Sequence, residues 1–151
     1  MTVAETFRNS AKIVLRFFGI NIQNITEMEV HPENFHTNLS AYVGITGNPS
    51  GLVSMEMEVD TCLKIASVIS TNTQTSFENI SKEIIREIIN QISGNALTEL
   101  WQHGYDSDMT PPSIITGDKI VVHHSKRSKE AFFLMDSDCG KIILKTFLSL
   151  N

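Results

Sequence analysis

The sequence predicts an α+β fold in which long amphipathic helices pack against a largely antiparallel sheet. Apolar residues recur at helical spacing near the N-terminus and again in the middle of the chain. Short runs rich in β-branched and apolar residues lie next to one another, separated by turn sequences, as in hairpins. Because the predicted helices and hairpins come in blocks, without strict alternation of strand and helix, an antiparallel sheet is favoured over a parallel one.

Composition and charge are those of one ordinary domain, residues 1–151. The chain is 41% hydrophobic and 19% charged, long enough for one buried core and too short for two ordinary domains. Its net charge of −5 argues against nucleic acid or an anionic membrane as a partner. No apolar run approaches the roughly 20 residues of a membrane-spanning helix, and the N-terminus lacks a signal-peptide pattern. A cytoplasmic protein is therefore expected.

The first part of the chain predicts a helix followed by a hairpin. Apolar residues at helical spacing predict a helix that ends near Gly19. From Ile22 to His36 the pattern is ambiguous, with an extended segment around Met28 to His31. The runs Leu39 to Thr46 and Leu52 to Glu58 predict two strands joined by a turn rich in glycine and proline.

The second strand of this hairpin alternates apolar with polar residues, so one of its faces is expected to lie in water. The polar residues of that face are Ser54, Glu56 and Glu58. Asp60 is the predicted N-cap of a following helix, and the polar run Ser70 to Ser76 is expected to end it.

The segment Ser81 to Thr98 predicts a strongly amphipathic helix, capped by Asn79 or Ser81 and ending near Gly104. One side of this helix is apolar and consists of Ile84, Ile85, Ile88, Ile89, Ile92 and Ala96. The opposite side carries Glu83, Glu87, Asn90 and Gly94 in a row.

Glu87 and Asn90 are three residues apart, so their carboxylate and carboxamide can meet one target group together. An ordinary solvated surface is the alternative interpretation, since any surface helix carries such residues. Trp101, near the end of the same helix, is expected to be a packing or interface residue, and a platform for stacking a ligand is the other interpretation.

The remainder of the chain predicts a polar loop and several strands. The loop runs from Tyr105 to Pro112. The predicted strands are Ser113 to Ile115, Lys119 to His123, Ala131 to Asp136 and Lys141 to Leu150.

Several common chemistries are unsupported. Adjacent His123 and His124 point to opposite faces of a strand, so no metal site is predicted. Cys62 and Cys139 lack the spacing of a zinc site or a disulfide framework and are expected to be free thiols. The sequence has no glycine-rich phosphate loop and no nucleophile elbow, so no cofactor of its own and no acyl-enzyme chemistry is expected.

The segment EIINQISGN, which contains Glu87, Asn90 and Gly94, resembles the Glu-x-x-Asn motif followed by Gly-Asn of CheX-type phosphatases. These belong to the CheC, CheX and FliY group of bacterial chemotaxis. The order of the predicted elements is similar over most of the chain and implies a CheC-like fold. The single motif resembles CheX, with one motif per subunit, rather than CheC, with two. Glu83 stands where members of the group often have Asp or Ser, which leaves its role open.

The resemblance implies hydrolysis of the aspartyl phosphate on a CheY-like response-regulator receiver. Asn90 would orient the attacking water and Glu87 would pair with the active-site lysine of the receiver, which would hold the Mg²⁺ itself. Glu83, Gly94 and Pro112 are the possible further partner contacts. Pro112 lies where the extended motif of the group has a proline, and a stiff loop before a strand is the equal alternative.

The resemblance also implies a homodimer formed through sheets. Lys141 to Leu150, apolar on both faces, is the candidate edge strand, and a strand buried within the monomer would show the same pattern. The rival function from another class is a non-catalytic module that binds a receiver or another signalling component. A small-molecule sensor is the second alternative, and it lacks a visible polar constellation in an apolar pocket.

Overall fold

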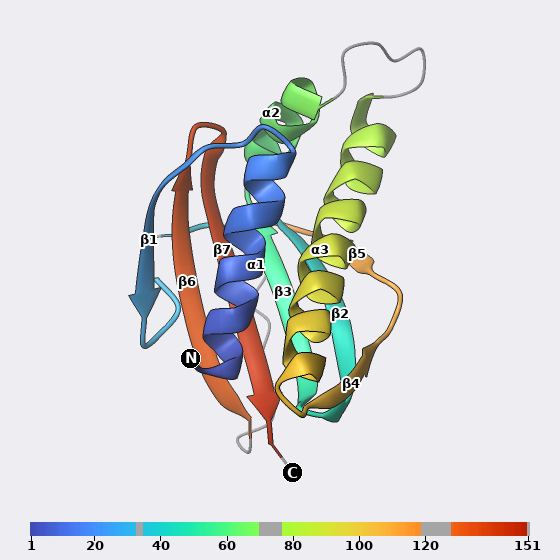
Figure 1. The fold of residues 1–151 in the computed structure, drawn as a ribbon. Helices are drawn as coiled ribbons and strands as arrows, with labels where there is room; N and C mark the ends of the chain where they lie inside the picture. The colour runs from blue at the N-terminus through green and yellow to red at the C-terminus, as the bar shows by residue number, and fades with distance from the viewer. Residues whose placement is uncertain (33–34, 70–76, 119–127, 151) are drawn as a thin grey trace.

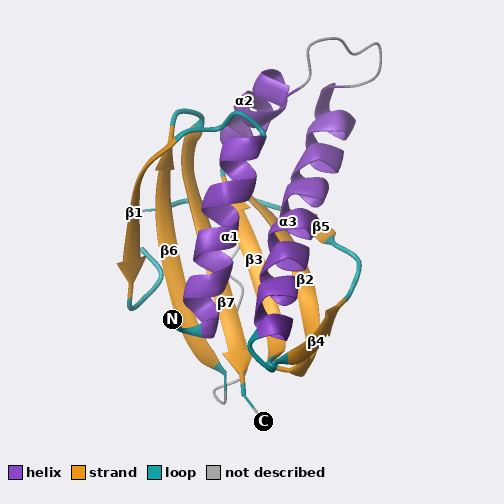
Figure 2. Ribbon diagram, in the orientation of Figure 1, coloured by secondary structure: helices purple, strands orange, loops and turns teal. Residues whose placement is uncertain are grey.

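Two long helices, α1 (Val3–Phe17) and α3 (Phe77–Gln102), lie side by side across one face of an antiparallel sheet in the computed structural model (Figure 1). The shorter helix α2 (Val59–Ile69) lies at one end of this helical layer. The structure describes residues 1–32, 35–69, 77–118 and 128–150. Figure 2 shows the helices in one layer over the strands, which confirms the predicted α+β fold.

The sheet has seven described strands in the order β1-β6-β7-β3-β2-β4, and β5 also pairs with β2. Every pairing among them is antiparallel. The strands are β1 (Ile22–Met28), β2 (Leu39–Asn48), β3 (Ser50–Met57), β4 (Asp106–Met109), β5 (Ser113–Thr116), β6 (Lys129–Ser137) and β7 (Gly140–Ser149). Among the described residues, no helix is both long and apolar enough to span a membrane.

Local signals explain both ends of α1. The backbone N–H of Glu5 donates to Thr2 Oγ1 and that of Thr2 donates to Glu5 Oε2, each at 3.1 Å, which forms a capping box. Gly19, with φ +88°, follows the end of the helix as predicted. The residues of α1 that pack on the core are Phe7, Ala11, Val14 and Leu15.

The predicted hairpin is confirmed, because β2 pairs with β3 from Leu39 opposite Met57 to Ile45 opposite Gly51. At Gly51, a Cβ atom would overlap the backbone carbonyl oxygen of Phe147 on β7. The close approach of this third strand therefore requires glycine at the start of β3.

The prediction of a wet face on β3 is wrong for Ser54 and Glu56, whose side chains are fully buried, while Glu58 is exposed. β3 is an interior strand between β7 and β2, and chain from the β1–β2 connection crosses behind it. His31 of that connection brings its Nε2 within 4.0 Å of Glu56 Oε2. Alternation along one strand cannot indicate such coverage, because the covering segment is remote in sequence.

Two predicted helix starts also differ from the structure. α2 begins at Val59, whose N–H donates to Asn38 Oδ1 at 2.7 Å, so Asp60 lies inside the first turn and does not cap it. α3 begins at Phe77, so Asn79 and Ser81 lie within the helix. At α2, a side chain distant in sequence thus takes the place of the predicted local cap.

Two strands lie elsewhere than expected. The extended segment before Pro32 is β1, Ile22–Met28, rather than a stretch around Met28 to His31. Part of the predicted loop before Pro112 is strand β4, because pairing with β2 satisfies its backbone while its polar side chains remain in water.

The predicted edge strand at the C-terminus is wrong, since β7 lies between β6 and β3 in the interior of the sheet. Apolar residues on both of its faces reflect burial on both sides. The ends of the described sheet are β1 on one side and β4 with β5 on the other. The predicted strand Lys119 to His123, His124 and the run Ser70 to Ser76 lie outside the described residues.

Candidate functional site

The apolar side of α3 is buried as predicted. Its fully buried residues are Ile85, Ile88, Ile89, Ile92 and Ala96, and Ile84 is partly buried against the same core. Each fully buried isoleucine contributes about 1.5–3 kcal/mol relative to an exposed one. This packing compensates for the weak helix propensity of β-branched residues and holds the opposite side of the helix in place.

Two further contacts fix the position of α3. Ser10 Oγ on α1 donates to the carbonyl oxygen of Ile92 at 2.6 Å. At the C-terminal end, the N–H of Tyr105 donates to the carbonyl oxygen of Leu100 at 3.0 Å and leads the chain into β4. The polar side of the helix is therefore presented on a firmly held element, as a binding or catalytic constellation needs.

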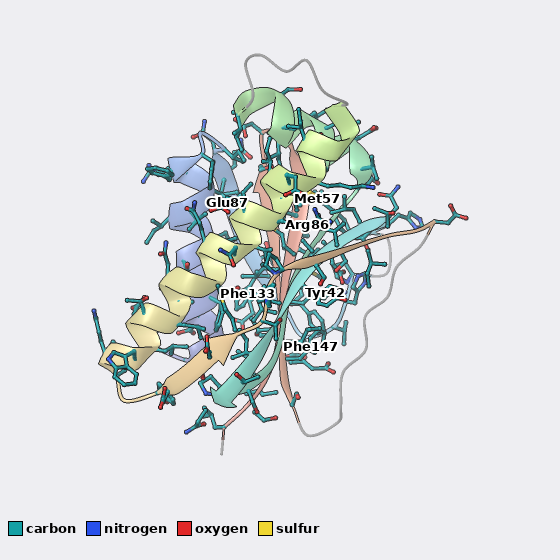
Figure 3. The ribbon with its side chains drawn as sticks, turned by 90° about the vertical axis from the view of Figure 1, so that its right-hand side faces the viewer. Tyr42, Met57, Arg86, Glu87, Phe133 and Phe147 are labelled. Atoms are coloured by element: carbon teal, nitrogen blue, oxygen red, sulfur yellow. The ribbon has the colours of Figure 1, made fainter. Side chains whose placement is uncertain are left out.

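Glu87 lies on the side of α3 that points away from the sheet (Figure 3). Its side chain is exposed, and its Oε1 accepts a hydrogen bond from Gln91 Nε2 at 2.8 Å. Within the described part of the chain, Oε2 of Glu87 accepts no hydrogen bond. Gln91 therefore orients the carboxylate while one oxygen stays available to an external cation.

Asn90 follows Glu87 by almost one helical turn and is half-buried. Its carboxamide forms no hydrogen bond to any residue in the described ranges. A carboxamide carries both a donor and an acceptor, so Asn90 can donate to one atom of an incoming group and accept from another. The predicted pair thus lies together on the outward side of α3.

Glu83 is already engaged within the chain, because its Oε1 forms an ion pair with Arg86 Nη1 one turn along the helix. Both side chains reach solvent, and such surface pairs contribute at most about 1 kcal/mol to stability. Arg86 lies on the flank of α3 that faces the viewer in Figure 3. A partner that needs the Glu83 carboxylate has to displace Arg86 or bind both.

Gly94 continues the outward stripe of α3. A Cβ atom placed there would meet only Met109 Cε, at 3.9 Å, which is an ordinary contact. Packing among the described residues therefore does not demand glycine at this position, and close approach of a partner stays a prediction.

Pro112 lies between β4 and β5, which both pair with β2 and run beside α3 (Figure 1). Just before it, the N–H of Thr110 donates to the carbonyl oxygen of Gly44 at 2.9 Å, and the N–H of Gly44 donates to Thr110 Oγ1 at 2.8 Å. Pro112 thus belongs to an anchored edge flanking the helix. This placement suits both the motif role and the stiff-loop role.

The described residues provide no other reactive centre. They contain no group of three or more potential metal ligands. Cys62 and Cys139 are free and buried, and burial raises the pKa of the Cys62 thiol to about 11. Both thiols are therefore poor nucleophiles at neutral pH.

Gln91 and Arg86 were not among the predicted site residues, although their spacing of four and three residues from Glu87 and Glu83 indicates side-chain pairs on a helix. Trp101 was predicted to be a packing or interface residue. Trp101 is 65% exposed, so packing within the described monomer is excluded.

The model of the family described as chemotaxis phosphatase CheX matches residues 39–136. No curated protein sequence gives a significant match.

Solved structures resemble the whole chain. A chemotaxis protein CheX from Desulfovibrio desulfuricans is 22% identical over 100% of both chains, with a TM-score of 0.81. CheX from Vibrio vulnificus is 17% identical over 99% of this chain and 97% of that one, with a TM-score of 0.83. A CheX from Borrelia burgdorferi, in complex with CheY, BeF3 and Mg²⁺, is 23% identical over 98% of each chain, with a TM-score of 0.80. These similarities confirm the CheC-like fold.

Proposed function

From the premise that this chain belongs to the CheX family of chemotaxis phosphatases, we propose that it hydrolyses the aspartyl phosphate of a CheY-like receiver domain. The observation that carries the proposal is the pair Glu87 and Asn90 on the outward side of α3. Asn90 has a carboxamide without an intramolecular partner in the described chain, and Glu87 has an exposed carboxylate oriented by Gln91. The similar CheX from Borrelia burgdorferi was solved bound to CheY, which supports a receiver as the partner.

The reaction needs little from the phosphatase. Water attacks phosphorus, the bond between phosphorus and the aspartyl oxygen breaks, and the products are the aspartate carboxylate, inorganic phosphate and a proton. The acyl phosphate is already reactive, so the missing element is a group that holds water in line with the breaking bond. Asn90 supplies it, with Oδ1 accepting from the water and Nδ2 donating to a phosphoryl oxygen.

Glu87 serves as a clamp. Its free carboxylate oxygen pairs with the active-site lysine of the receiver, and this contact sets Asn90 in register with the phosphorus. The Mg²⁺ that neutralises the phosphoryl group belongs to the receiver. The structure of a CheX with CheY, BeF3 and Mg²⁺ supports the assignment of this Mg²⁺ to the receiver.

The decisive experiment follows the decay of a receiver from the same genome, phosphorylated with a small phosphodonor, with catalytic amounts of the protein. The parent should perform multiple turnovers. Asn90→Ala should lose most of this activity, by about 10²-fold or more, while retaining receiver binding. Equal rates for the parent and Asn90→Ala would refute the water-positioning role. Stable binding without acceleration by the parent would instead favour the non-catalytic module.

A homodimer formed through sheet edges is the second part of the proposal. Because β7 is interior, the described strands available for it are β1 or the edge formed by β4 and β5. Light scattering at micromolar concentration should give about twice the chain mass of 16.9 kDa. A mass near that of one chain would count against the dimer.

A further inference from the structure

Two large apolar side chains project into solvent from the second half of α1. Ile13 is 66% exposed and Phe17 is 80% exposed. A single exposed apolar residue is ordinary, but these two are four residues apart and form one continuous patch along the helix. Within the described residues, neither side chain is covered.

The patch lies on the side of α1 that borders α3. Ser10 precedes Ile13 by three residues and Phe17 by seven, so the three side chains share one stripe of the helix. Ser10 Oγ donates to the carbonyl oxygen of Ile92 on α3. The stripe therefore runs along the seam, the line of contact between the two helices. Ile13 and Phe17 form the solvent-exposed edge of that seam.

The same contact sets the level of the patch along α3. The two helices run antiparallel in Figure 1, so residues after Ser10 lie beside residues before Ile92. At 1.5 Å per residue, Ile13 and Phe17 lie about 4.5 and 10.5 Å beyond Ser10, and Glu87 lies about 7.5 Å from Ile92 in the same direction. Packed helices are about 8 to 10 Å apart. Glu87 thus lies across the seam from the patch, between the levels of its two members.

We propose that Ile13 and Phe17 bind the receiver domain on which Glu87 and Asn90 act, as the apolar half of one docking surface. The inference rests on the proposed function. It assigns two roles to two helices: α3 supplies the charged clamp and the reacting carboxamide, and α1 supplies buried apolar area that raises affinity. The receiver must therefore present an apolar side chain beside its phosphorylated pocket.

Position favours a receiver over a second copy of the chain. Because Glu87 lies across the seam at the level of Ile13 and Phe17, a receiver held by Glu87 reaches the patch, whereas a second copy seated there would crowd the proposed site. Arg16, exposed three residues after Ile13 and next to Phe17, places one cation beside the patch, whereas Lys12 lies on the side of α1 toward β1. That charge complements an acidic, phosphorylated pocket.

The test compares the double variant Ile13→Gln/Phe17→Gln with the matched control Val30→Gln. Val30 is also exposed, at 68%, but lies after β1 and outside the helical layer. Glutamine has good helix propensity, so α1 should persist, and unchanged circular dichroism checks this. The probe for binding is the receiver loaded with beryllium fluoride and Mg²⁺, and turnover is measured with the phosphorylated receiver.

Truncation of an apolar anchor at the centre of an interface typically weakens binding by about 10- to 100-fold. We expect that increase in Kd and in KM for the double variant, with kcat at saturating receiver retained. Val30→Gln should match the parent in all three quantities.

Each other outcome has a definite meaning. If the double variant binds the receiver as tightly as the parent, the docking surface is refuted while the proposed function stands. If the parent binds the receiver without hydrolysing it, the proposed function fails, and a weaker Kd for the double variant still supports the surface. If the double variant converts a parent dimer to a monomer and leaves the receiver Kd unchanged, the patch is an interface between copies and the inference is wrong.

Discussion

Nζ of Lys145 lies 2.6 Å from Oε2 of Glu56, and both side chains are almost completely buried. The two residues lie diagonally on neighbouring strands, because Lys145 on β7 pairs directly with Ser54 of β3. Val53 and Met55, which alternate with Ser54 and Glu56 along β3, pack in the core beneath the helices. The ion pair therefore lies on the opposite face of the sheet, remote from Glu87 and Asn90.

Lys145→Met should destabilise the protein by about 3–5 kcal/mol, because it leaves the Glu56 carboxylate buried without its cation. The double variant Glu56→Gln/Lys145→Met should recover much of that loss, since no uncompensated charge remains. Urea unfolding of the parent, both single variants and the double variant measures the coupling. Strictly additive effects of the two substitutions would show that the pair is not energetically linked.

The cost of Lys145→Met should depend on pH. Burial raises the pKa of Glu56 above its ordinary value, and the Lys145 ammonium partly opposes this shift. Removing Lys145 should raise the pKa further. A folded-state pKa above the unfolded value means that stability is lost as pH rises through the folded pKa. The deficit of Lys145→Met relative to the parent should thus be smaller at pH 5 than at pH 8. A constant deficit would mean that Glu56 does not titrate in this range.

The two thiols should resist alkylation in the native protein. Burial raises the pKa of Cys62 to about 11, and burial with the neighbouring Asp138 raises that of Cys139. At pH 8, labelling by iodoacetamide should be at least about 100-fold slower in the folded than in the urea-unfolded protein, because the thiolate and access to it are both scarce. Mass spectrometry reports the labelled fraction at each cysteine. Rapid labelling of either thiol without denaturant would contradict its buried position.

Glu87→Gln should separate charge from shape at the proposed clamp. The substitution keeps the size of the side chain but removes the charge that attracts the lysine of the receiver. We expect a Kd for the beryllium-fluoride-loaded receiver about 10-fold higher, together with a weaker dependence of Kd on salt concentration. Thr98→Ser, farther along α3, is the conservative control. If the Kd of Glu87→Gln depended on salt as strongly as that of the parent, the proposed ion pair between Glu87 and the receiver lysine would be wrong.

The hydrogen bond from Gln91 to Glu87 should have a smaller effect. Gln91→Ala frees the Glu87 carboxylate to take other rotamers, and an exposed hydrogen bond of this kind contributes about 0.5–1.5 kcal/mol. We expect receiver affinity to fall by only a few-fold, with kcat unchanged and the melting temperature within a few degrees of the parent. A loss as large as that of Asn90→Ala would mean that Gln91 itself contacts the reacting groups.

The sequence by itself determined the features that depend on local periodicity. Side-chain spacing and turn residues within one or two elements predict four features: the isoleucine side and the polar side of α3, the end of α1 near Gly19, and the β2–β3 hairpin. For the same reason, the amino-acid sequence was enough to pair Glu87 with Asn90, since neighbours on a helix are set by their separation in the chain.

Only the tertiary structure decided which surfaces are covered. Burial of Glu56 depends on β7 and on the crossing segment that carries His31, both distant in sequence. The interior position of β7 depends on the order in which strands pair, which periodicity does not encode. Likewise, Ile13 and Phe17 lie at the level of Glu87 only because Ser10 contacts Ile92 and sets the position of α1 against α3.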